Sequence, residues 1–319
     1  MARRIRILHS EAKHYCVKAR AILESFADVD YADLRRAQLL KKVASYDALI
    51  IRLNNAIDRE VLERARNLKV IATPTTGTNH IDEKAAHQGD VKIVSLKGER
   101  KFLNSISSTA EHTFGLLLAL MRRIPVAHYS VLSGEWAREK FFGHELSGKT
   151  IGIIGFGRLG RMAARYADTF GMTVLANETD RDVTPPVYVK SCSLETLLKK
   201  SDVVTLHTPL NEATKNLLNA RCLRSMKKGA VLLNTARGAL VDEREAVRLL
   251  RKGHLAGFAG DVLPGEEKPN FKVLDSPLVR YARQYANVII TPHIGGAAVE
   301  AIDKTDIFIA QELRKFFKG

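Results

Sequence analysis

Short β-branched runs alternate with longer amphipathic segments along the chain, and this alternation predicts parallel sheets with crossover helices. In the first hundred residues we expect strands at Ile5–Leu8, Ala48–Ile51, Val70–Ala72 and Val91–Val94. From Lys149 a second series begins, with strands expected at Thr150–Ile154, Thr173–Ala176, Val203–Leu206, Ala230–Asn234, Ala256–Asp261 and Val288–Thr291. The chain is therefore predicted to be an α/β protein with two doubly wound parallel sheets.

A helix is predicted between the two series. Ser108 and Glu111 have capping-box spacing at its start, and Pro125 is expected to end it. Most of its faces are apolar, and a helix of that kind must be buried. We therefore expect a homodimer that buries the helix at 108–123 against a second subunit.

The last stretch, residues 297–318, reads as one further helix. We expect it to return to the first unit and complete it. The two domains would then be discontinuous in sequence, with crossings near Asn104 and Thr291.

Composition narrows the class of protein. The 319 residues suit two domains, and 45% of them are hydrophobic. No apolar run approaches the roughly 20 residues that span a bilayer, and no signal peptide is visible at the start, so we expect a soluble cytoplasmic protein. The formal net charge is +15, but the basic residues are spread along the chain, which favours a solvated basic surface over binding to nucleic acid or a membrane. Three scattered cysteines predict neither a disulfide framework nor a metal site.

A glycine-rich loop follows the first strand of the second series. Gly155, Gly157 and Gly160 form a G-x-G-x-x-G between a strand and a helical pattern that runs from Arg158 to Phe170. Such glycines permit a tight turn, a close approach to a pyrophosphate and tight packing of helix on strand. Glu178, after the next strand, is placed to bind the adenosine ribose hydroxyls and favours NAD over NADP, although Arg181 nearby weakens that preference.

Three residues after later strands suit hydride transfer to a 2-oxo acid. Arg237 has the fork that binds a carboxylate, His293 is a proton donor, and Glu266 is a carboxylate that orients such a donor. Loops at the carboxyl ends of parallel strands line the ligand crevice of such sheets. The three are therefore predicted to share one catalytic site.

At these residues the chain resembles the D-isomer-specific 2-hydroxyacid dehydrogenases, in particular the members like D-3-phosphoglycerate dehydrogenase. The resemblance is collinear from about residue 50 to residue 298. It rests on the segments AEHTFGLLLALMRRIP (110–125), GEW and EL-GKTIGIIGFGRLG (134–160), HTPLNEAT (207–214), NTARGALVDE (234–243), AGDV (259–262) and TPHIGG (291–296).

The resemblance implies a flavodoxin-like substrate domain, 1–104 completed by 294–319, and a Rossmann NAD-binding domain, 105–293, with a cleft between them. It implies that Arg237 binds the substrate carboxylate and that Glu266 and His293 form the acid–base pair. The positions implied to bind NAD are the three loop glycines with Arg158, Leu159, Glu178, Thr208, Thr235, Ala236, Arg237, Asp261, His293, Gly295 and Gly296. The positions implied to face the substrate in the first domain are Arg52, Thr76 and Gly77. The short stretch after the final helix leads us to expect a short form without regulatory domains.

Some positions depart from the family pattern. Glu267 is adjacent to Glu266, so the choice between them rests on spacing. The segment 97–101 is unusually basic, and either it is a solvated loop or it holds a phosphate or second carboxylate of the substrate.

Two alternatives remain. One is an NADH-sensing, corepressor-like binding protein, because fold alone does not fix function. The other is a formate- or phosphite-type dehydrogenase of the same fold; Glu266 argues against it, because formate enzymes of this fold pair the histidine with an amide.

Overall fold

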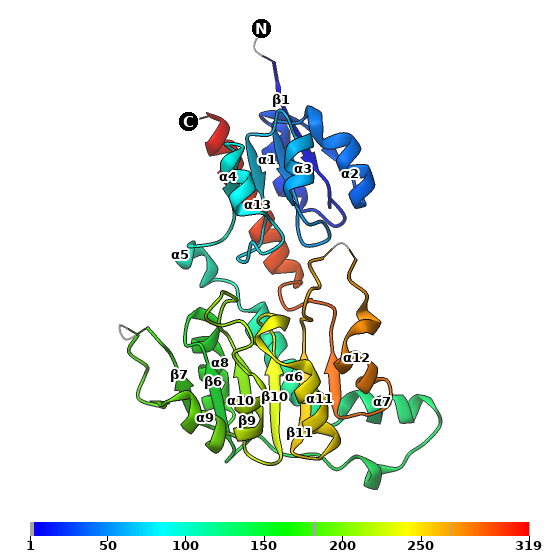
Figure 1. The fold of residues 1–319 in the computed structure, drawn as a ribbon, viewed down its shortest axis with the longest axis vertical. Helices are drawn as coiled ribbons and strands as arrows, with labels where there is room; N and C mark the ends of the chain where they lie inside the picture. Colours follow the sequence, from blue (N-terminus) through cyan, green and yellow to red (C-terminus); the bar gives the residue numbers. More distant parts are fainter. Residues whose placement is uncertain (1–2, 181–182, 269, 319) are drawn as a thin grey trace. The chain divides into compact units, whose positions relative to one another are not determined.

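The computed structural model describes residues 3–180, 183–268 and 270–318 and divides the chain into two compact units (Figure 1). Unit 1 comprises Met1–Ser105, Glu267–Phe271 and Ala297–Gly319, and unit 2 comprises Ile106–Glu266 and Lys272–Gly296. Both units contain a fully parallel sheet with helices, as the alternating pattern predicts. The last helix belongs to unit 1. The chain passes back from unit 2 to unit 1 between Gly296 and Ala297, rather than at the predicted residue 294.

Unit 1 has a five-stranded sheet of order β2-β1-β3-β4-β5, the order of flavodoxin-like folds. Its strands are β1 (Ile5–His9), β2 (Ala27–Tyr31), β3 (Ala48–Ile50), β4 (Val70–Ala72) and β5 (Lys92–Val94). Its helices are α1 (Val17–Glu24), α2 (Arg36–Lys42), α3 (Arg59–Arg64), α4 (Glu83–Gln88), α5 (Arg100–Leu103) and α13 (Val299–Lys318).

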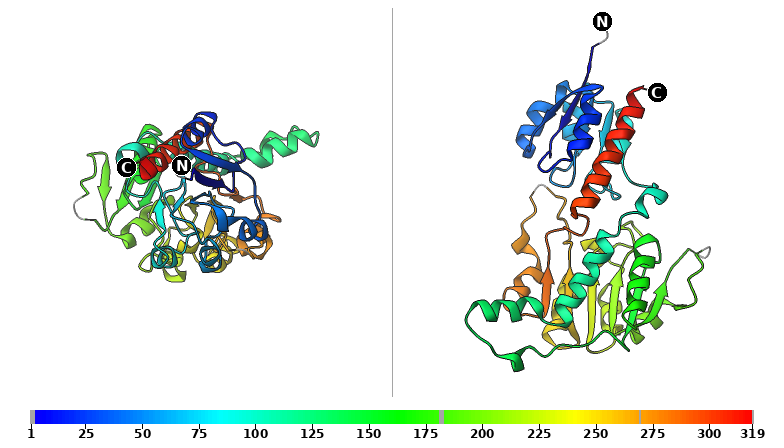
Figure 2. Two further views of the ribbon diagram at one scale, coloured as in Figure 1. Left: turned by 90° about the horizontal axis from the view of Figure 1, so that it is seen from above. Right: turned by 180° about the vertical axis from the view of Figure 1, so that it is seen from behind.

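Helices α2, α3 and α4 cover one face of this sheet, and α1 and α13, from opposite ends of the chain, cover the other. Side chains of α2, α3 and α4 pack into a buried cluster with the central strands, as Leu39, Val61 and Ala86 do. Helix α13 packs along α1 and contacts β5 (Figure 2). The edge strand β2 was not predicted, because its alternating Asp28 and Asp30 interrupt the apolar run.

Unit 2 has a seven-stranded sheet of order β12-β11-β10-β9-β6-β7-β8. Its strands are β6 (Thr150–Ile154), β7 (Thr173–Asn177), β8 (Val189–Ser191), β9 (Val203–Leu206), β10 (Ala230–Asn234), β11 (Leu255–Gly260) and β12 (Val288–Ile290). Its helices are α6 (Ser108–Met121), α7 (Ile124–Leu132), α8 (Arg158–Thr169), α9 (Leu194–Lys200), α10 (Ala220–Ser225), α11 (Glu243–Arg251) and α12 (Pro277–Ala282).

Two buried layers hold this sheet. On one face α6 and α8 pack through Phe114, Leu117 and Ala163, and on the other face α9 to α12 pack through residues such as Leu198 and Leu250. The strand order reverses between β6 and β9, which is the switch point at which ligands bind in open α/β sheets.

The predicted details of helix α6 were partly wrong. Ser108 is its first residue rather than its cap, and the hydroxyl of Ser107 donates to Glu111 instead. Pro125 lies in the first turn of α7 rather than ending α6, because α6 already stops at Met121.

The apolar faces of α6 are covered within unit 2, where the helix contacts α8 and the strands β10, β11 and β12. Its apolarity therefore no longer supports a subunit interface. Exposed apolar side chains lie instead on α7 and the segment after it, which project from the sheet of unit 2 (Figure 1); they are Ile124, Tyr129, Val131, Leu132, Trp136 and Phe142.

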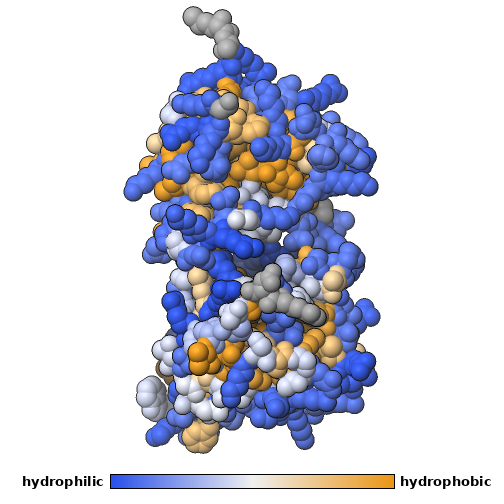
Figure 3. Space-filling model, turned by 90° about the vertical axis from the view of Figure 1, so that its left-hand side faces the viewer, coloured by the Kyte–Doolittle hydropathy of each residue, from blue (hydrophilic) through white to orange (hydrophobic). Residues whose placement is uncertain are grey.

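The face of the molecule drawn in Figure 3 is mostly hydrophilic, as expected for a chain with 27% charged residues. Within the described residues, no helix is both long and apolar enough to cross a membrane.

Candidate active site

The glycine loop lies between β6 and α8, at the switch point of the unit 2 sheet. Gly155 has φ +90°, and a Cβ there would meet the His207 carbonyl carbon at 2.8 Å. A Cβ at Gly160 would meet the Gly155 oxygen at 2.1 Å, whereas a Cβ at Gly157 would meet nothing within 4 Å. The three glycines thus provide the turn, the close helix packing and the open backbone that a dinucleotide phosphate requires.

Glu178, just after β7, is fixed by one amide of the glycine loop and two amides of its own loop. Its carboxylate accepts hydrogen bonds from the amides of Phe156 (2.7 Å), Thr179 (2.7 Å) and Asp180 (3.1 Å). Burial acts to raise the pKa of Glu178, but these amide donors outweigh it and the pKa is lowered. The carboxylate is therefore charged and oriented next to the loop, as binding of ribose hydroxyls requires. Arg181 lies outside the described residues.

Arg158 begins α8 and is partly buried. Its guanidinium donates to the carbonyl of Ile106, and burial lowers its pKa without removing its charge at neutral pH. Leu159 follows it in the first turn of α8. The arginine thus places a partly buried positive charge beside the glycine loop.

His207 and Thr208 follow β9, across the switch point from the glycine loop. Burial lowers the pKa of His207 to about 4, so its ring is neutral near pH 7. The ring contacts the Thr205 hydroxyl at 3.1 Å. Its backbone forms the surface against which Gly155 packs.

The histidine and glutamate of the predicted acid–base pair are in contact. Nδ1 of His293, three residues after β12, lies 2.8 Å from Oε1 of Glu266. Oε2 of Glu266 accepts from the amide of Leu263 at 3.1 Å, which fixes the carboxylate in its own loop. Both side chains are partly exposed, at 27% and 22%. His293 thus has one ring nitrogen held by a carboxylate, which leaves Nε2 to exchange a proton with a ligand.

The loop that carries Arg237 packs against the loop of Glu266 at the glycine that follows Arg237. A Cβ at Gly238 would lie 2.1 Å from the Leu263 carbonyl carbon and 2.2 Å from the Pro264 nitrogen. The loop after β10 therefore rests directly on the backbone of the Glu266 loop. Sequence reasoning missed Gly238, because its contact joins segments 25 residues apart and has no local signature.

Asp261, at the end of β11, organises the loop that carries His293. It is 1% exposed, and its carboxylate accepts from the amides of Ile294 (2.9 Å) and Gly295 (2.7 Å) and from the hydroxyl of Thr291 (2.5 Å). Its carbonyl accepts from the amide of His293 at 2.8 Å. The remaining positions predicted to line the cofactor site lie at or near the same carboxyl ends; they are Thr235, Ala236 and Gly296.

The predicted substrate positions of unit 1 also follow strand ends. Arg52, after β3, donates to both carboxylate oxygens of Asp306 at 2.7 Å, and the Asp306 side chain is fully buried. Burial raises the pKa of Asp306 to about 6 although Arg52 acts to lower it. Thr76 and Gly77 lie in the loop after β4, where Thr75 donates to the Gly77 carbonyl at 2.8 Å. The charge of Arg52 is therefore already balanced within unit 1.

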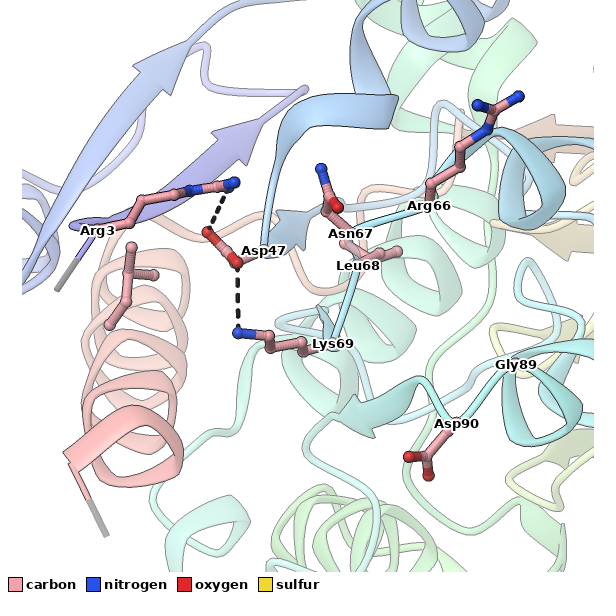
Figure 4. Close-up of a pocket in the computed structure, with 9 residues that line it drawn as sticks. Arg3, Asp47, Arg66, Asn67, Leu68, Lys69, Gly89 and Asp90 are labelled. Atoms are coloured by element: carbon pink, nitrogen blue, oxygen red, sulfur yellow. Dashed lines mark hydrogen bonds and ion pairs between the residues drawn. The ribbon is translucent and has the colours of Figure 1, made fainter.

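A separate hollow of about 510 Å³ in unit 1 is lined by Arg3, Asp47, Asn67, Lys69 and Asp90 among others (Figure 4). It lies at the amino ends of β1, β3 and β4, opposite the edge where open parallel sheets bind ligands. Asp47 is held there by Arg3 and Lys69. The hollow is therefore not part of the candidate active site. Within the described residues no group of three or more potential metal-ligating side chains is found.

Comparison with known proteins identifies the family. Residues 114–295 match the model of the D-isomer specific 2-hydroxyacid dehydrogenase, NAD binding domain. The chain belongs to the D-isomer specific 2-hydroxyacid dehydrogenase family. The resemblance seen in the sequence is thus confirmed, as is the presence of the family's NAD-binding domain.

Curated proteins that are similar to this chain have different named activities. The chain is 37% identical over 278 residues to D-3-phosphoglycerate dehydrogenase of Bacillus subtilis (strain 168). This alignment covers 86% of this chain and 50% of that protein. It is 36% identical over 293 residues to glyoxylate reductase of Thermococcus litoralis, covering 89% of this chain and 84% of that protein. The chain thus spans about half the length of the first of these relatives.

Solved structures share the two-unit fold. A protein from Thermus thermophilus is 36% identical with a TM-score of 0.84, covering 99% of this chain and 97% of its own. The apo-structure of D-lactate dehydrogenase from Escherichia coli is 28% identical with a TM-score of 0.84, covering 98% and 97%. The prediction of two parallel-sheet domains is confirmed, and the cleft between them stays a prediction.

Proposed function

We propose that this protein is an NAD-dependent oxidoreductase that interconverts a small D-2-hydroxy acid and its 2-oxo acid. The observation that carries the proposal is the 2.8 Å contact between His293 and Glu266, in loops that follow neighbouring strands and adjoin the Arg237 loop. A cation, a proton donor and an orienting carboxylate are the three groups that reduction of a 2-oxo acid requires.

Each residue has a separate task in this proposal. Arg237 binds the substrate carboxylate through its guanidinium fork and holds the carbonyl in a polarised state. His293 gives its Nε2 proton to the oxygen as the alcohol forms, and in the oxidative direction it accepts that proton. Glu266 holds Nδ1 and so orients the ring with Nε2 toward the substrate. NAD, when bound, supplies the hydride acceptor or donor.

The residues proposed to hold NAD are those of the switch point. The amides of the glycine loop and the start of α8 bind the phosphates, with Arg158 beside them. Glu178 binds the ribose hydroxyls and repels a 2′-phosphate, which favours NAD over NADP. The loop held by Asp261 lines the nicotinamide end.

The substrate is a small anion. The named relatives act on phosphoglycerate, glyoxylate and hydroxypyruvate, so a phosphorylated or dicarboxylic acid is one candidate. The basic segment at 97–101 would favour such an acid, although Lys97 lies 3.5 Å from Glu83.

We further propose a homodimer, with the exposed apolar side chains of α7 and the following segment as the interface.

The test is oxidation of NADH, followed at 340 nm, with glyoxylate, pyruvate, hydroxypyruvate, 2-oxoglutarate and 3-phosphohydroxypyruvate, and with NADPH in parallel. We expect turnover with at least one acid and its loss in His293→Asn. Asparagine suits this substitution because His293 has φ +54°, a conformation that asparagine tolerates. Tight NADH binding without turnover of any acid would contradict the proposal and favour the cofactor-sensing alternative.

A further inference from the structure

Helix α6 contributes two adjacent polar side chains to the strand ends that carry the proposed catalytic loops. Thr113 contacts the hydroxyl of Thr235, two residues before Arg237, at 2.8 Å. His112 reaches the segment before His293, where its Nε2 lies 2.9 Å from the Thr291 hydroxyl and 3.3 Å from Oδ1 of Asp261.

The His293 loop needs external anchors. His293 has a left-handed backbone with φ +54°, which is unfavourable for a residue with a side chain. The amides of His293, Ile294 and Gly295 donate to Asp261, and the Thr291 hydroxyl donates to its carboxylate. Asp261 is therefore the residue to which the loop is anchored. A side chain that holds Asp261 in place also holds His293 in place.

The hydrogen bonds around Thr291 determine that Nε2 of the His112 ring carries a proton. The single hydroxyl proton of Thr291 is committed to Oδ1 of Asp261 at 2.5 Å. The contact from Nε2 of His112 to that hydroxyl therefore requires a proton on Nε2, which donates to Thr291 and faces Asp261. The ring also contacts the loop, since a Cβ at Gly295 would meet Cδ2 of His112 at 3.7 Å.

We infer that His112 is a positioning residue that acts through Thr291 and Asp261 to hold the loop of His293. This inference rests on the proposed function for the role of His293, but the contacts themselves do not depend on it. Thr113 plays the matching part for the loop of Arg237, because its own proton goes to the Thr109 carbonyl and Thr235 must donate to it.

The test uses His112→Leu, which removes the donor at similar bulk, and His112→Gln, which keeps an N–H donor at the end of its side chain. In His112→Leu we expect kcat to fall about tenfold or more while KM for the 2-oxo acid changes less than about twofold, because the Arg237 loop has its own anchor. In His112→Gln kcat should stay within about threefold of the wild type.

A second measurement needs no turnover. In wild-type protein labelled with ¹⁵N-histidine, we expect a protonated Nε2 on His112. In the labelled His112→Leu variant, we expect the ring signals of His293 to shift. Thr113→Val, on the same helix, is the matched control and should leave the His293 signals in place.

An unprotonated Nε2 on His112, or unmoved His293 signals in His112→Leu, would overturn the inference. So would equal shifts in Thr113→Val, since the effect would then belong to the helix in general. If the wild type reduces none of the acids, the proposed function fails, and the ring signals still decide the role of His112.

Discussion

Substitution of Gly238 by alanine tests how the Arg237 loop and the Glu266 loop are held together. The added Cβ would lie 2.1 Å from the Leu263 carbonyl carbon and 2.2 Å from the Pro264 nitrogen, and both are backbone atoms that no side-chain rotation can move aside. To restore an ordinary contact of about 3.5 Å, the two loops must separate by about 1.4 Å. Leu263 is also the residue whose amide holds Glu266, so the 2.8 Å contact to His293 should be lost.

A displacement of about 1 Å at a catalytic group costs roughly 100-fold in rate. We therefore expect Gly238→Ala to lower kcat for the preferred 2-oxo acid by about two orders of magnitude, with a destabilisation of about 1–3 kcal/mol from overpacking. The assay is steady-state oxidation of NADH at 25 °C, with NADH affinity from fluorescence and folding from circular dichroism.

Gly115→Ala is the matched control. Gly115 lies in α6, and a Cβ there would meet nothing within 4 Å. This variant should keep the wild-type kcat and gain about 0.5–1 kcal/mol of stability, because alanine is the better helix former. If Gly238→Ala is folded and its kcat lies within about twofold of the wild type, the reasoning about the two loops is wrong.

Three further predictions follow from other parts of the molecule. Burial, with Arg52 and Arg20, lowers the pKa of His9 to about 3, so between pH 6.5 and 3 the unfolded chain binds a proton that the folded one does not, and stability falls as the pH falls. His9 alone should cost about 2 kcal/mol between pH 7 and pH 5, and urea unfolding of His9→Gln at both values should show a smaller loss than the wild type. Glu178→Ala should raise KM for NADH about tenfold, since it removes both the ribose ligand and the acceptor of three loop amides, and an unchanged ratio of NADH to NADPH efficiency would refute the role of Glu178 in cofactor choice. Light scattering should find a dimer in the wild type and a monomer in Trp136→Ser, whose side chain is 89% exposed in the chain alone, whereas a wild-type monomer at micromolar concentration would sink the proposed interface.

Apolar strand runs and the glycine loop were the most predictable features. Strand β10 has the predicted bounds, and α8 ends one residue before the predicted Phe170. Strand β2 escaped prediction because an edge strand buries only part of each residue and tolerates Asp28 and Asp30. The short edge strand β8 escaped for the same reason.

The placement of the candidate residues at strand ends could be predicted, but the contacts that hold them in place could not. Spacing favoured Glu266 over its neighbour, and the structure brings Glu266 to His293. Gly238 and His112 both lie in segments that carry the family resemblance, but the sequence assigned neither a role, because the contact that each makes is with a residue far away in the chain. The family resemblance predicted that Arg52 faces the substrate. That pattern contains no information about its buried partner Asp306, which lies 254 residues away.

The discontinuity of unit 1 has a consequence for the order in which the chain folds during synthesis. Its first 105 residues lack α13, and α13 packs on α1, where Ala19 and Leu23 are fully buried. At 5–20 residues per second, roughly 10–40 s pass between synthesis of Ser105 and of α13. Unit 2 has all its strands and helices by Gly296 and is able to fold during that interval. The amino-terminal segment, made first, therefore completes its fold last, and until then its apolar surface is open to chaperones and to aggregation.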